Sequence, residues 1–290
     1  MPSPPLACTV RACGLPLARG DRAWACARGH SFDLARAGYV NLLQPQDRKA
    51  RAPGDSKAAV EARAALQAAG IGAALVHEIV RRAQAMCLPE AAVVVDLGSG
   101  TGDALAALAA LAAAHAIIGI GIDLSTAAAG HASHRYPTLT WVVANADRRL
   151  PITDATVDLV LSLHARRNPA ECARVLKPSG VLLMAVPAED DLAELRTAVL
   201  GGDVGHDRVA SLVAEHAALF RLRGRATVRE RHRLGRAPLL ALLGATYRGA
   251  RTSRAPSVEA LADLEVTVAS EVCEWSPRAD SDRASPADAT

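Results

Sequence analysis

Apolar and polar residues follow two different periods along most of this 290-residue chain. Short runs rich in valine, isoleucine and leucine are typical of parallel strands that are buried on both faces. Such runs occupy residues 92–97, 117–122, 139–144 and 181–186, and a further segment that ends at residue 161. Segments with helical spacing separate these runs. The pattern therefore predicts an α/β fold with a doubly wound, mostly parallel sheet.

Helices are predicted between and around these strands. Ser56 is a good N-cap for a helix that ends near residue 69, and Gly70 and Gly72 break the chain before the next helix. The other helices are expected over residues 73–86, 104–111, 126–134, 169–176, 190–200 and 207–217. Two more strands, over residues 218–234 and 264–274, bring the sheet to seven strands.

The first strand leads into a glycine-rich turn with a strong chemical signal. The turn follows Asp96 and consists of Gly98, Ser99, Gly100, Thr101 and Gly102. Glycines let the backbone turn tightly and approach a cofactor at the carboxyl edge of the sheet. Nicotinamide, flavin and S-adenosylmethionine (SAM) enzymes all use such turns, but the spacing G-x-G-x-G differs from the dinucleotide G-x-G-x-x-G. Asp96 and Asp103 would repel a pyrophosphate and suit the ammonium and sulfonium groups of SAM. SAM is therefore the expected cofactor, and a tight turn without a ligand is the alternative.

The tips of the next two strands carry polar residues that would complete the same site. Asp123, with Leu124 beside it, ends the second strand, where an acid can bind the ribose hydroxyls of a cofactor. The third strand is followed by Asn145, Ala146 and Asp147, which could hold the adenine amino group. The carboxyl ends of parallel strands meet at one edge, so these residues are expected to line one pocket.

Metal chemistry is predicted at the N-terminus. Cys8, Cys13, Cys26 and His30 form two pairs, and three thiolates with an imidazole suit a closed tetrahedral Zn2+ site. So small a module has few bulky apolar residues and needs a metal to fold. Buried cysteines without a metal are the alternative. We therefore divide the chain into a zinc-binding module (1–45), a linker with two helices (46–90), a cofactor-binding domain (91–275) and a disordered tail (276–290).

Charge is segregated along the chain, although the net charge is only +3. Residues 1–57 contain nine Lys/Arg against four Asp/Glu, and residues 220–254 contain ten against one. Such basic segments indicate a polyanionic partner or a solvated surface. On a strand, the odd-numbered positions would place six guanidinium groups on one face, facing either phosphates or solvent. These arginines are Arg221, Arg223, Arg225, Arg229, Arg231 and Arg233.

The cellular location is expected to be cytoplasmic, without a membrane partner. The N-terminus lacks the layout of a signal peptide, and the longest apolar stretch divides into a helix and a strand. The sequence does not set the oligomeric state, and a homodimer remains open.

Several stretches together resemble the zinc-containing 23S ribosomal RNA (guanine-N1)-methyltransferases, which include housekeeping enzymes and macrolide or lincosamide resistance enzymes. The most specific stretch is residues 26–43, beside the zinc ligands. The resemblance continues through residues 54–56, 62–63, 96–102, 119–125, 168–180 and 192–195. It implies a class I SAM-dependent methyltransferase fold, SAM and Zn2+ as cofactors, and 23S rRNA as the partner. It also implies that residues 1–45 are an RNA-recognition module and that residues 91–275 are the methyltransferase domain. The implied reaction is methylation of guanine N1 in a hairpin loop, with drug resistance as one outcome.

The chain departs from the family pattern at positions that the resemblance places near the cofactor or the target base. Gly72 and Asp191 stand where the family usually has an aromatic residue and a histidine, and His164–Arg166 replaces an aromatic-Ala-Pro segment. Near the C-terminus, residues 243–248 match the family's Met-Gly-Pro segment only loosely. A pocket adapted to a shifted target and a weakened activity are both consistent with these changes.

Methylation of guanine N1 needs a group that accepts the N1 proton, and a base that is outside a duplex. His164, at the tip of the fourth strand, is the candidate acceptor, while a solvent-facing or base-stacking histidine is the alternative. Two other functions remain open. One is a SAM methyltransferase of a small natural product, and the other is a non-catalytic RNA-binding relative with a degraded site.

Overall fold

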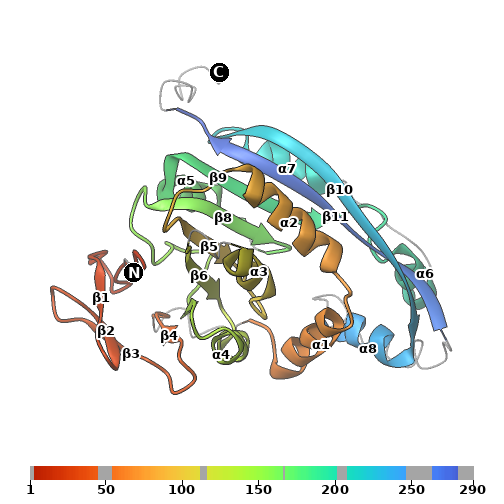
Figure 1. Cartoon of the computed structure of the whole chain (residues 1–290), viewed down its shortest axis with the longest axis horizontal. Helices are drawn as coiled ribbons and strands as arrows, with labels where there is room; N and C mark the ends of the chain where they lie inside the picture. The colour runs from red at the N-terminus through yellow and green to blue at the C-terminus, as the bar shows by residue number, and fades with distance from the viewer. Residues whose placement is uncertain are drawn as a thin grey trace.

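The computed structural model describes residues 3–44, 54–111, 116–165, 167–200, 208–245 and 263–279. Its centre is an eight-stranded sheet with the order β10-β11-β9-β8-β5-β6-β7-β4 (Figure 1). The strands are β4 (Val40–Asn41), β5 (Val93–Leu97), β6 (Ile118–Asp123), β7 (Thr140–Val143), β8 (Val157–Leu163), β9 (Leu176–Pro187), β10 (Phe220–Gly235) and β11 (Asp263–Pro277). Neighbouring strands from β4 to β9 pair in parallel, and β11 pairs antiparallel with both β9 and β10. The predicted doubly wound sheet is confirmed, and β4 adds an eighth strand to the seven that were expected.

Helices cover both faces of this sheet, because strands that are buried on both sides need apolar partners on each. One face packs against α2, α3 and α4 through Ile79, Leu105 and Ala132, and the other packs against α5 and α7 through Val175 and Leu212. The helices are α1 (Lys57–Ala68), α2 (Ala73–Ala85), α3 (Asp103–Leu111), α4 (Thr126–Arg135), α5 (Pro169–Val175), α6 (Ala193–Leu200), α7 (Arg208–His216) and α8 (Arg236–Ala245).

Local sequence signals account for the boundaries of α1 and α2. The Ser56 side chain accepts a hydrogen bond from the backbone N–H of Ala59, so it caps α1 as predicted. Gly70 and Gly72 both have positive φ values, of 78° and 90°, and they turn the chain between the two helices. Helix α8 was not predicted, because its apolar run directly follows a long strand without a capping signal.

No single helix in the described part of the chain is long and apolar enough to cross a membrane. Helices α1 and α2 pass that test only as a pair, and they are bent by 76° at the break between them.

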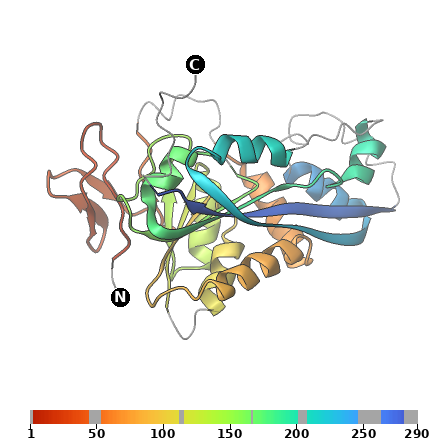
Figure 2. The ribbon, with the colours of Figure 1, turned by 90° about the horizontal axis from the view of Figure 1, so that it is seen from above.

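The N-terminal module has a small sheet of its own, made of β1 (Leu17–Arg19), β2 (Ala23–Cys26) and β3 (Ser31–Asp33). Figures 1 and 2 show it at one end of the molecule, with the long β10–β11 ribbon toward the other. Trp24, which is 1% exposed, joins Leu6 and Val40 in the same apolar cluster as the central strands. The module is therefore stabilised by packing against the large domain, and we did not foresee this contribution from the sequence.

Strand β10 differs from the expected row of six arginines. A bulge between Leu222 and Gly224 shifts the pairing with β11, so Arg221 lies on the opposite face from Arg225. The prediction of six guanidinium groups on one face is therefore wrong.

Carboxylates lie against the arginines that follow the bulge. Arg225 bonds Glu271, Arg229 bonds Asp190 and Arg233 bonds Asp263, each at 2.7 Å. These bonds hold the pKa values of Asp190 and Asp263 below their usual range. Protein carboxylates, and not only solvent, therefore offset much of the charge on this strand.

The C-terminal boundary also differs from the expected one. Strand β11 continues to Pro277, and the Arg278 backbone N–H donates to Leu219 O at 2.8 Å. The first residues of the segment predicted to be disordered are thus ordered, and residues 280–290 lie outside the described part of the chain.

Candidate functional site

The glycine turn lies between β5 and α3, at the carboxyl edge of the sheet. Side chains of Trp141 and Ala165 pack closely against its backbone. A Cβ atom at Gly102 would collide with the Trp141 ring, and one at Gly98 would lie 2.6 Å from Ala165 Cβ. Gly102 also has a φ of 85°, which favours glycine. The turn can therefore be built only from glycines at these positions.

The side chains of the turn are engaged within the protein. Thr101 is buried and donates from Oγ1 to Gln67 Oε1 at 2.7 Å, and a Cβ atom at Gly121 would lie 2.9 Å from Ser99 Oγ. The turn therefore offers a ligand mainly its backbone, as expected for a close approach to a cofactor.

Two buried acids lie beside the turn. Asp123 accepts hydrogen bonds from the backbone N–H groups of Gly100 and Ser125, at 2.9 and 2.8 Å. Asp96 is buried beside Asp123 and is 2% exposed. Burial, together with the nearby Asp123 charge, raises the pKa of Asp96 to about 8. Burial also raises the pKa of Asp123.

These observations fit SAM. A buried carboxylate without a cation is costly, and a cationic ligand would restore its ionised form. The ammonium and sulfonium groups of SAM supply that charge, whereas a pyrophosphate would add repulsion. The hydrogen bonds to Asp123 orient its carboxylate at the strand tip, where it can accept from ribose hydroxyls.

The expected adenine segment follows β7 and is held next to Asp123. The Ala144 N–H donates to Asp123 O at 3.0 Å, and Asn168 Nδ2 donates to Ala146 O at 2.8 Å. Asn145 Oδ1 accepts from the N–H of Asp147, which closes a short turn. Leu124 packs among apolar residues beside α4. The structure thus brings the turn, Asp123 and residues 145–147 together at one edge of the sheet.

His164 lies at the tip of β8 and has a φ of 54°. Its Nε2 atom is 3.0 Å from Ser270 Oγ on β11, and Ala165 next to it packs against the glycine turn. The His164 residue is exposed to solvent, yet desolvation by the neighbouring protein lowers the pKa of the imidazole to about 4. The charges of Arg208 and Arg63 act in the same direction. His164 is therefore neutral at neutral pH and lies beside the cofactor turn.

Asp191 and Gly72 are both hydrogen-bonded within the protein, to residues of β11 and β10. Asp191 Oδ1 accepts from the Ala269 N–H at 2.9 Å, and burial raises the pKa of Asp191 to about 6. Gly72 donates its backbone N–H to Glu230, which also accepts from Ala74 at the start of α2. A side chain at Gly72 would meet open space, but its φ of 90° disfavours any residue except glycine. Their assignment as cofactor contacts stays a prediction.

The sequence interpretation did not identify the residues of α1 that cover the turn. Arg63 and Gln67 lie one helical turn apart on α1, and Asp55 precedes the helix. Arg63 bonds Asp55 at 2.5 Å, and Gln67 bonds Thr101. A four-residue spacing of polar residues on a short helix after a Gly-Asp-Ser segment was the available signal, but it is too common to be specific.

The predicted metal ligands lie together in the N-terminal module. The ligand atoms of Cys8, Cys13, Cys26 and His30 all lie within 4.8 Å of one another. Cys13 Sγ and Cys26 Sγ are 3.9 Å apart, and His30 Nδ1 is 3.4 and 3.5 Å from the sulfurs of Cys8 and Cys26. A tetrahedron with Zn–S bonds of about 2.3 Å requires sulfur atoms about 3.8 Å apart. The donor set and its spacing therefore fit Zn2+, which supports this site over unligated cysteines.

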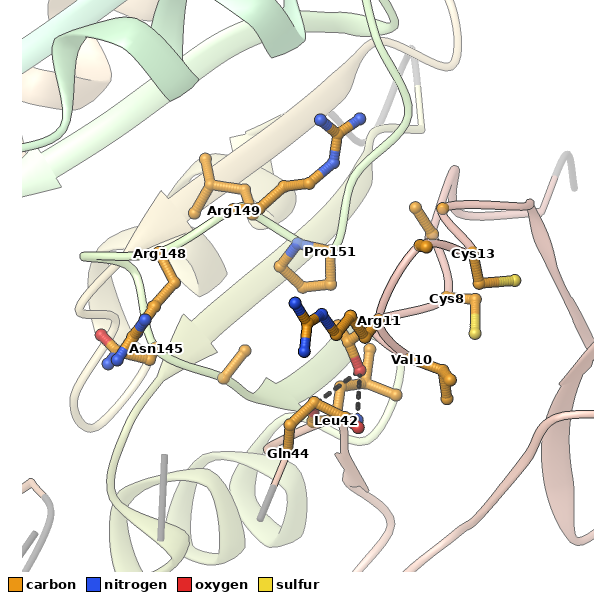
Figure 3. Close-up of a pocket in the computed structure, with 16 residues that line it drawn as sticks. Cys8, Val10, Arg11, Cys13, Leu42, Gln44, Asn145, Arg148, Arg149 and Pro151 are labelled. Carbon is orange, nitrogen blue, oxygen red and sulfur yellow. Dashed lines mark hydrogen bonds between the residues drawn. The ribbon is translucent and has the colours of Figure 1, made fainter. Parts of the chain in front are cut away.

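A cleft of about 410 Å³ lies between this module and the loop that follows β7 (Figure 3). The zinc-ligand segment from Cys8 to Gly14 forms one wall, and Asn145 to Pro151 forms the other. Figure 3 shows Arg11 reaching from the first wall toward Pro151, while Arg148 lies beside Asn145. Together with Arg149, these exposed arginines make the cleft basic.

Comparison with known proteins agrees with both parts of the site. The family described as "RlmA, N-terminal", a zinc ribbon, matches residues 7–51, and the family described as "Methyltransferase domain" matches residues 94–180. The 23S rRNA (guanine(748)-N(1))-methyltransferase of Streptomyces fradiae is 38% identical over 228 residues, covering 76% of this chain and 79% of the relative. A Micromonospora griseorubida protein, provisionally named a 23S rRNA (guanine-N(1)-)-methyltransferase, is 38% identical over 263 residues, covering 83% of this chain and 85% of the relative.

A solved structure supports the fold alone. A chain in the complex between the Haloferax volcanii Trm112 methyltransferase activator and a methyltransferase superposes with a TM-score of 0.52 at 20% identity. The match covers 78% of this chain and 99% of that one. With the glycine turn, the buried acids and the Cys/His cluster in place, and with 38% identity across most of the chain, this protein belongs to the zinc-containing 23S rRNA (guanine-N1)-methyltransferase family.

Proposed function

We propose that this protein uses SAM to methylate N1 of a guanine in a hairpin loop of 23S rRNA. The observation that carries the proposal is the presence, in one chain, of the Cys/His cluster and a SAM-type turn with two buried acids. The names of the 38% identical relatives give the substrate class. Guanine 748, named for the Streptomyces fradiae relative, is the first nucleotide to test.

Each part of the cofactor site has a defined task in this proposal. When bound, SAM supplies an electrophilic methyl group on its sulfonium. Asp123 binds the ribose hydroxyls, the segment 145–147 holds the adenine, and Asp96 provides the negative charge near the amino-acid end. Holding the acceptor nitrogen in line with the methyl group supplies most of the acceleration in such a reaction.

His164 is the proposed acceptor of the N1 proton. Its lowered pKa keeps the imidazole neutral at neutral pH, so one ring nitrogen has a lone pair. The nearby Ser270 hydroxyl orients the ring through Nε2. The same low pKa makes the imidazole a weak base, so His164 serves best if it accepts the proton as the N1–methyl bond forms.

The basic cleft of Figure 3 is the surface that we propose for RNA phosphates. Arg11 comes from the zinc module, whereas Arg148 and Arg149 follow the strand that carries the adenine segment. An RNA strand bound there would contact the module and the methyltransferase domain at once. Strand β10 is a weaker candidate, because Arg225, Arg229 and Arg233 are bonded to carboxylates at 2.7 Å, whereas Arg149 of the cleft has a longer ion pair with Asp154, at 3.4 Å.

The test uses purified protein with SAM that carries a labelled methyl group. Incubation with protein-free 23S rRNA should label the RNA, and incubation with a pool of small metabolites should not. Label in metabolites alone would favour a natural-product methyltransferase, and no label despite SAM binding would favour a non-catalytic relative. Asp123→Ala serves as the control, because losing a hydrogen bond to a charged group costs about 1.5–3 kcal/mol of SAM affinity.

Three further properties depend on this function. An rRNA substrate implies a cytoplasmic location. Light scattering tests the homodimer that the sequence leaves open, which would have twice the chain mass of 30.1 kDa. Expression in a susceptible host tests resistance to macrolides and lincosamides.

A further inference from the structure

The start of α1 is fastened to the tip of β6, next to the cofactor site. A Cβ atom at Gly54 would lie only 2.6 Å from the backbone nitrogen of Ser125. The Ser125 hydroxyl donates to Asp55 O at 2.6 Å. One helical turn beyond Arg63, Gln67 accepts from Thr101 of the glycine turn. The contacts before α1 and at Gln67 therefore hold this helix against the glycine turn of the cofactor site.

Arg63 lies between these two attachments and over the turn. Its Nη1 atom is 2.5 Å from Asp55 Oδ2, and its Nη2 atom donates to Ala245 O at 3.1 Å. A Cβ atom at Gly100 would lie 3.3 Å from the same Nη1 atom. The guanidinium group is therefore held against the backbone of Gly100, where the absence of a side chain leaves it room.

The charge of Arg63 acts on both ends of the cofactor site. It lowers the pKa of Asp123, against the larger effect of burial and the opposing charge of Asp55. It also contributes to the low pKa of His164, after burial and Arg208. The geometry agrees, because Arg63 lies over Gly100, whose N–H bonds Asp123, and Gly98 of the same turn packs against Ala165 after the tip of β8.

That part of SAM contains a carboxylate, which the acids of the site cannot bind. Asp96, Asp123 and Asp55 would repel it. A guanidinium group has five N–H donors in a planar fork that matches a carboxylate, and the contacts above engage one donor each toward Asp55 and Ala245. A charge-assisted pair of this kind is strong and fixes orientation.

We propose that Arg63 binds the methionine carboxylate of SAM, and that Asp55 and Ala245 hold its guanidinium over Gly100 before the cofactor arrives. This inference rests on the proposed function only through the use of SAM, and it is independent of the RNA target. It assigns a cofactor-binding role to a helix outside the strand tips.

Three ligands separate the carboxylate contact from other effects. S-adenosylhomocysteine has the whole amino-acid group, S-adenosyl-3-thiopropylamine lacks only the carboxylate, and 5′-methylthioadenosine lacks the amino-acid part. Titration calorimetry measures their affinities for the wild type, Arg63→Gln and Arg63→Lys. Lys57→Gln is the matched control, because it removes an exposed positive charge from the same helix.

Arg63→Gln should lower the affinity for S-adenosylhomocysteine about 10-fold to 100-fold and leave the other two affinities within about 2-fold. Arg63→Lys should recover part of the loss, and Lys57→Gln should change none of the three. An equal loss for all ligands would mean that Arg63 only supports the fold of α1, and no loss would exclude the contact. Both results would overturn the proposal. A wild-type protein that binds none of the three would refute the cofactor assignment itself.

Discussion

At the residue scale, the buried carboxylate of Asp96 has the most direct consequence. Its pKa of about 8 without a ligand means that most molecules carry a protonated Asp96 at pH 6. The groups that act on the site around it are Asp123 on β6, and Asp55 and Arg63 at α1. Of these, only Arg63 is a cation, and it stabilises the ionised form of Asp123.

We therefore predict that SAM binding is coupled to ionisation of Asp96. SAM affinity should rise with pH up to about 8, by at most 10-fold per pH unit, and binding should release a proton below that pH. Calorimetry in buffers with different ionisation enthalpies counts this proton. Asp96→Asn should bind SAM more weakly and show a flat pH profile, and a wild-type affinity that is independent of pH would contradict the assignment.

The same shift affects stability without the cofactor. Because the pKa of Asp96 is raised in the folded state, its contribution to stability is present below the pKa of the unfolded chain and is lost as the pH rises toward 8. The ligand-free Asp96→Asn protein should therefore unfold at a higher temperature than the wild type at pH 7. A site that favours its ligand at a cost to stability is a common compromise.

At the element scale, sequence patterns predicted the parts that depend on local signals. The Ser56 cap, the glycine break before α2 and the acid at the tip of β6 all depend on neighbouring residues, and the structure has them as expected. The bulge in β10 and the acids that bond its arginines could not be predicted. They depend on register with β11 and on a loop after β9, and both are distant in sequence.

The same reason explains what was missed in the candidate site. Thr101 was predicted as part of the cofactor-binding turn, but no sequence signal indicated that its hydroxyl bonds Gln67, 34 residues earlier. Arg63 belonged to a stretch that resembles the family, yet nothing in its sequence surroundings indicates that α1 crosses the turn. Residues at strand tips are predictable because the topology of the sheet brings them together, whereas the covering helix is placed by tertiary contacts.

We make opposite predictions for the basic cleft and for strand β10 in RNA binding. Changing Arg11, Arg148 and Arg149 to Ala should weaken binding to 23S rRNA and reduce the salt slope by about 0.7 per lost contact on single-stranded RNA. Changing Arg225, Arg229 and Arg233 to Ala is the matched control, and it should leave the slope nearly unchanged, because each is bonded to a carboxylate at 2.7 Å, more tightly than Arg149 to Asp154 at 3.4 Å. Salt-dependent filter binding measures both slopes. The reverse order would place the RNA on β10.

At the scale of the whole molecule, the zinc module and the methyltransferase domain share one apolar core and one basic cleft. Trp24 packs in the same cluster as the central strands, and β4 pairs with β7, the strand that leads to the adenine segment. The module therefore does two things in this account. It supplies part of the RNA surface, and it completes the edge of the sheet beside the cofactor site.

Removal of zinc should separate these contributions. We expect one zinc per chain by metal analysis, and loss of the metal in Cys13→Ser but not in Cys87→Ser, because Cys87 is exposed and distant from the cluster in sequence. Zinc-free protein should change its tryptophan fluorescence as Trp24 loses its packing, lose RNA affinity, and still bind S-adenosylhomocysteine. Purified protein with well under one zinc per chain and wild-type RNA binding would exclude the metal site.

The central claim is that the product is N1-methylguanine in large-subunit rRNA, and primer extension tests it most directly. A methyl group on N1 removes a Watson–Crick donor, so reverse transcriptase should stop one nucleotide before the modified guanine in 23S rRNA treated with protein and SAM. The stop should be absent without SAM, and it should be reduced for Asp123→Ala at limiting SAM concentration. Methylation at N7 or at the ribose leaves pairing intact, so uptake of labelled methyl into the RNA without a stop would contradict the account.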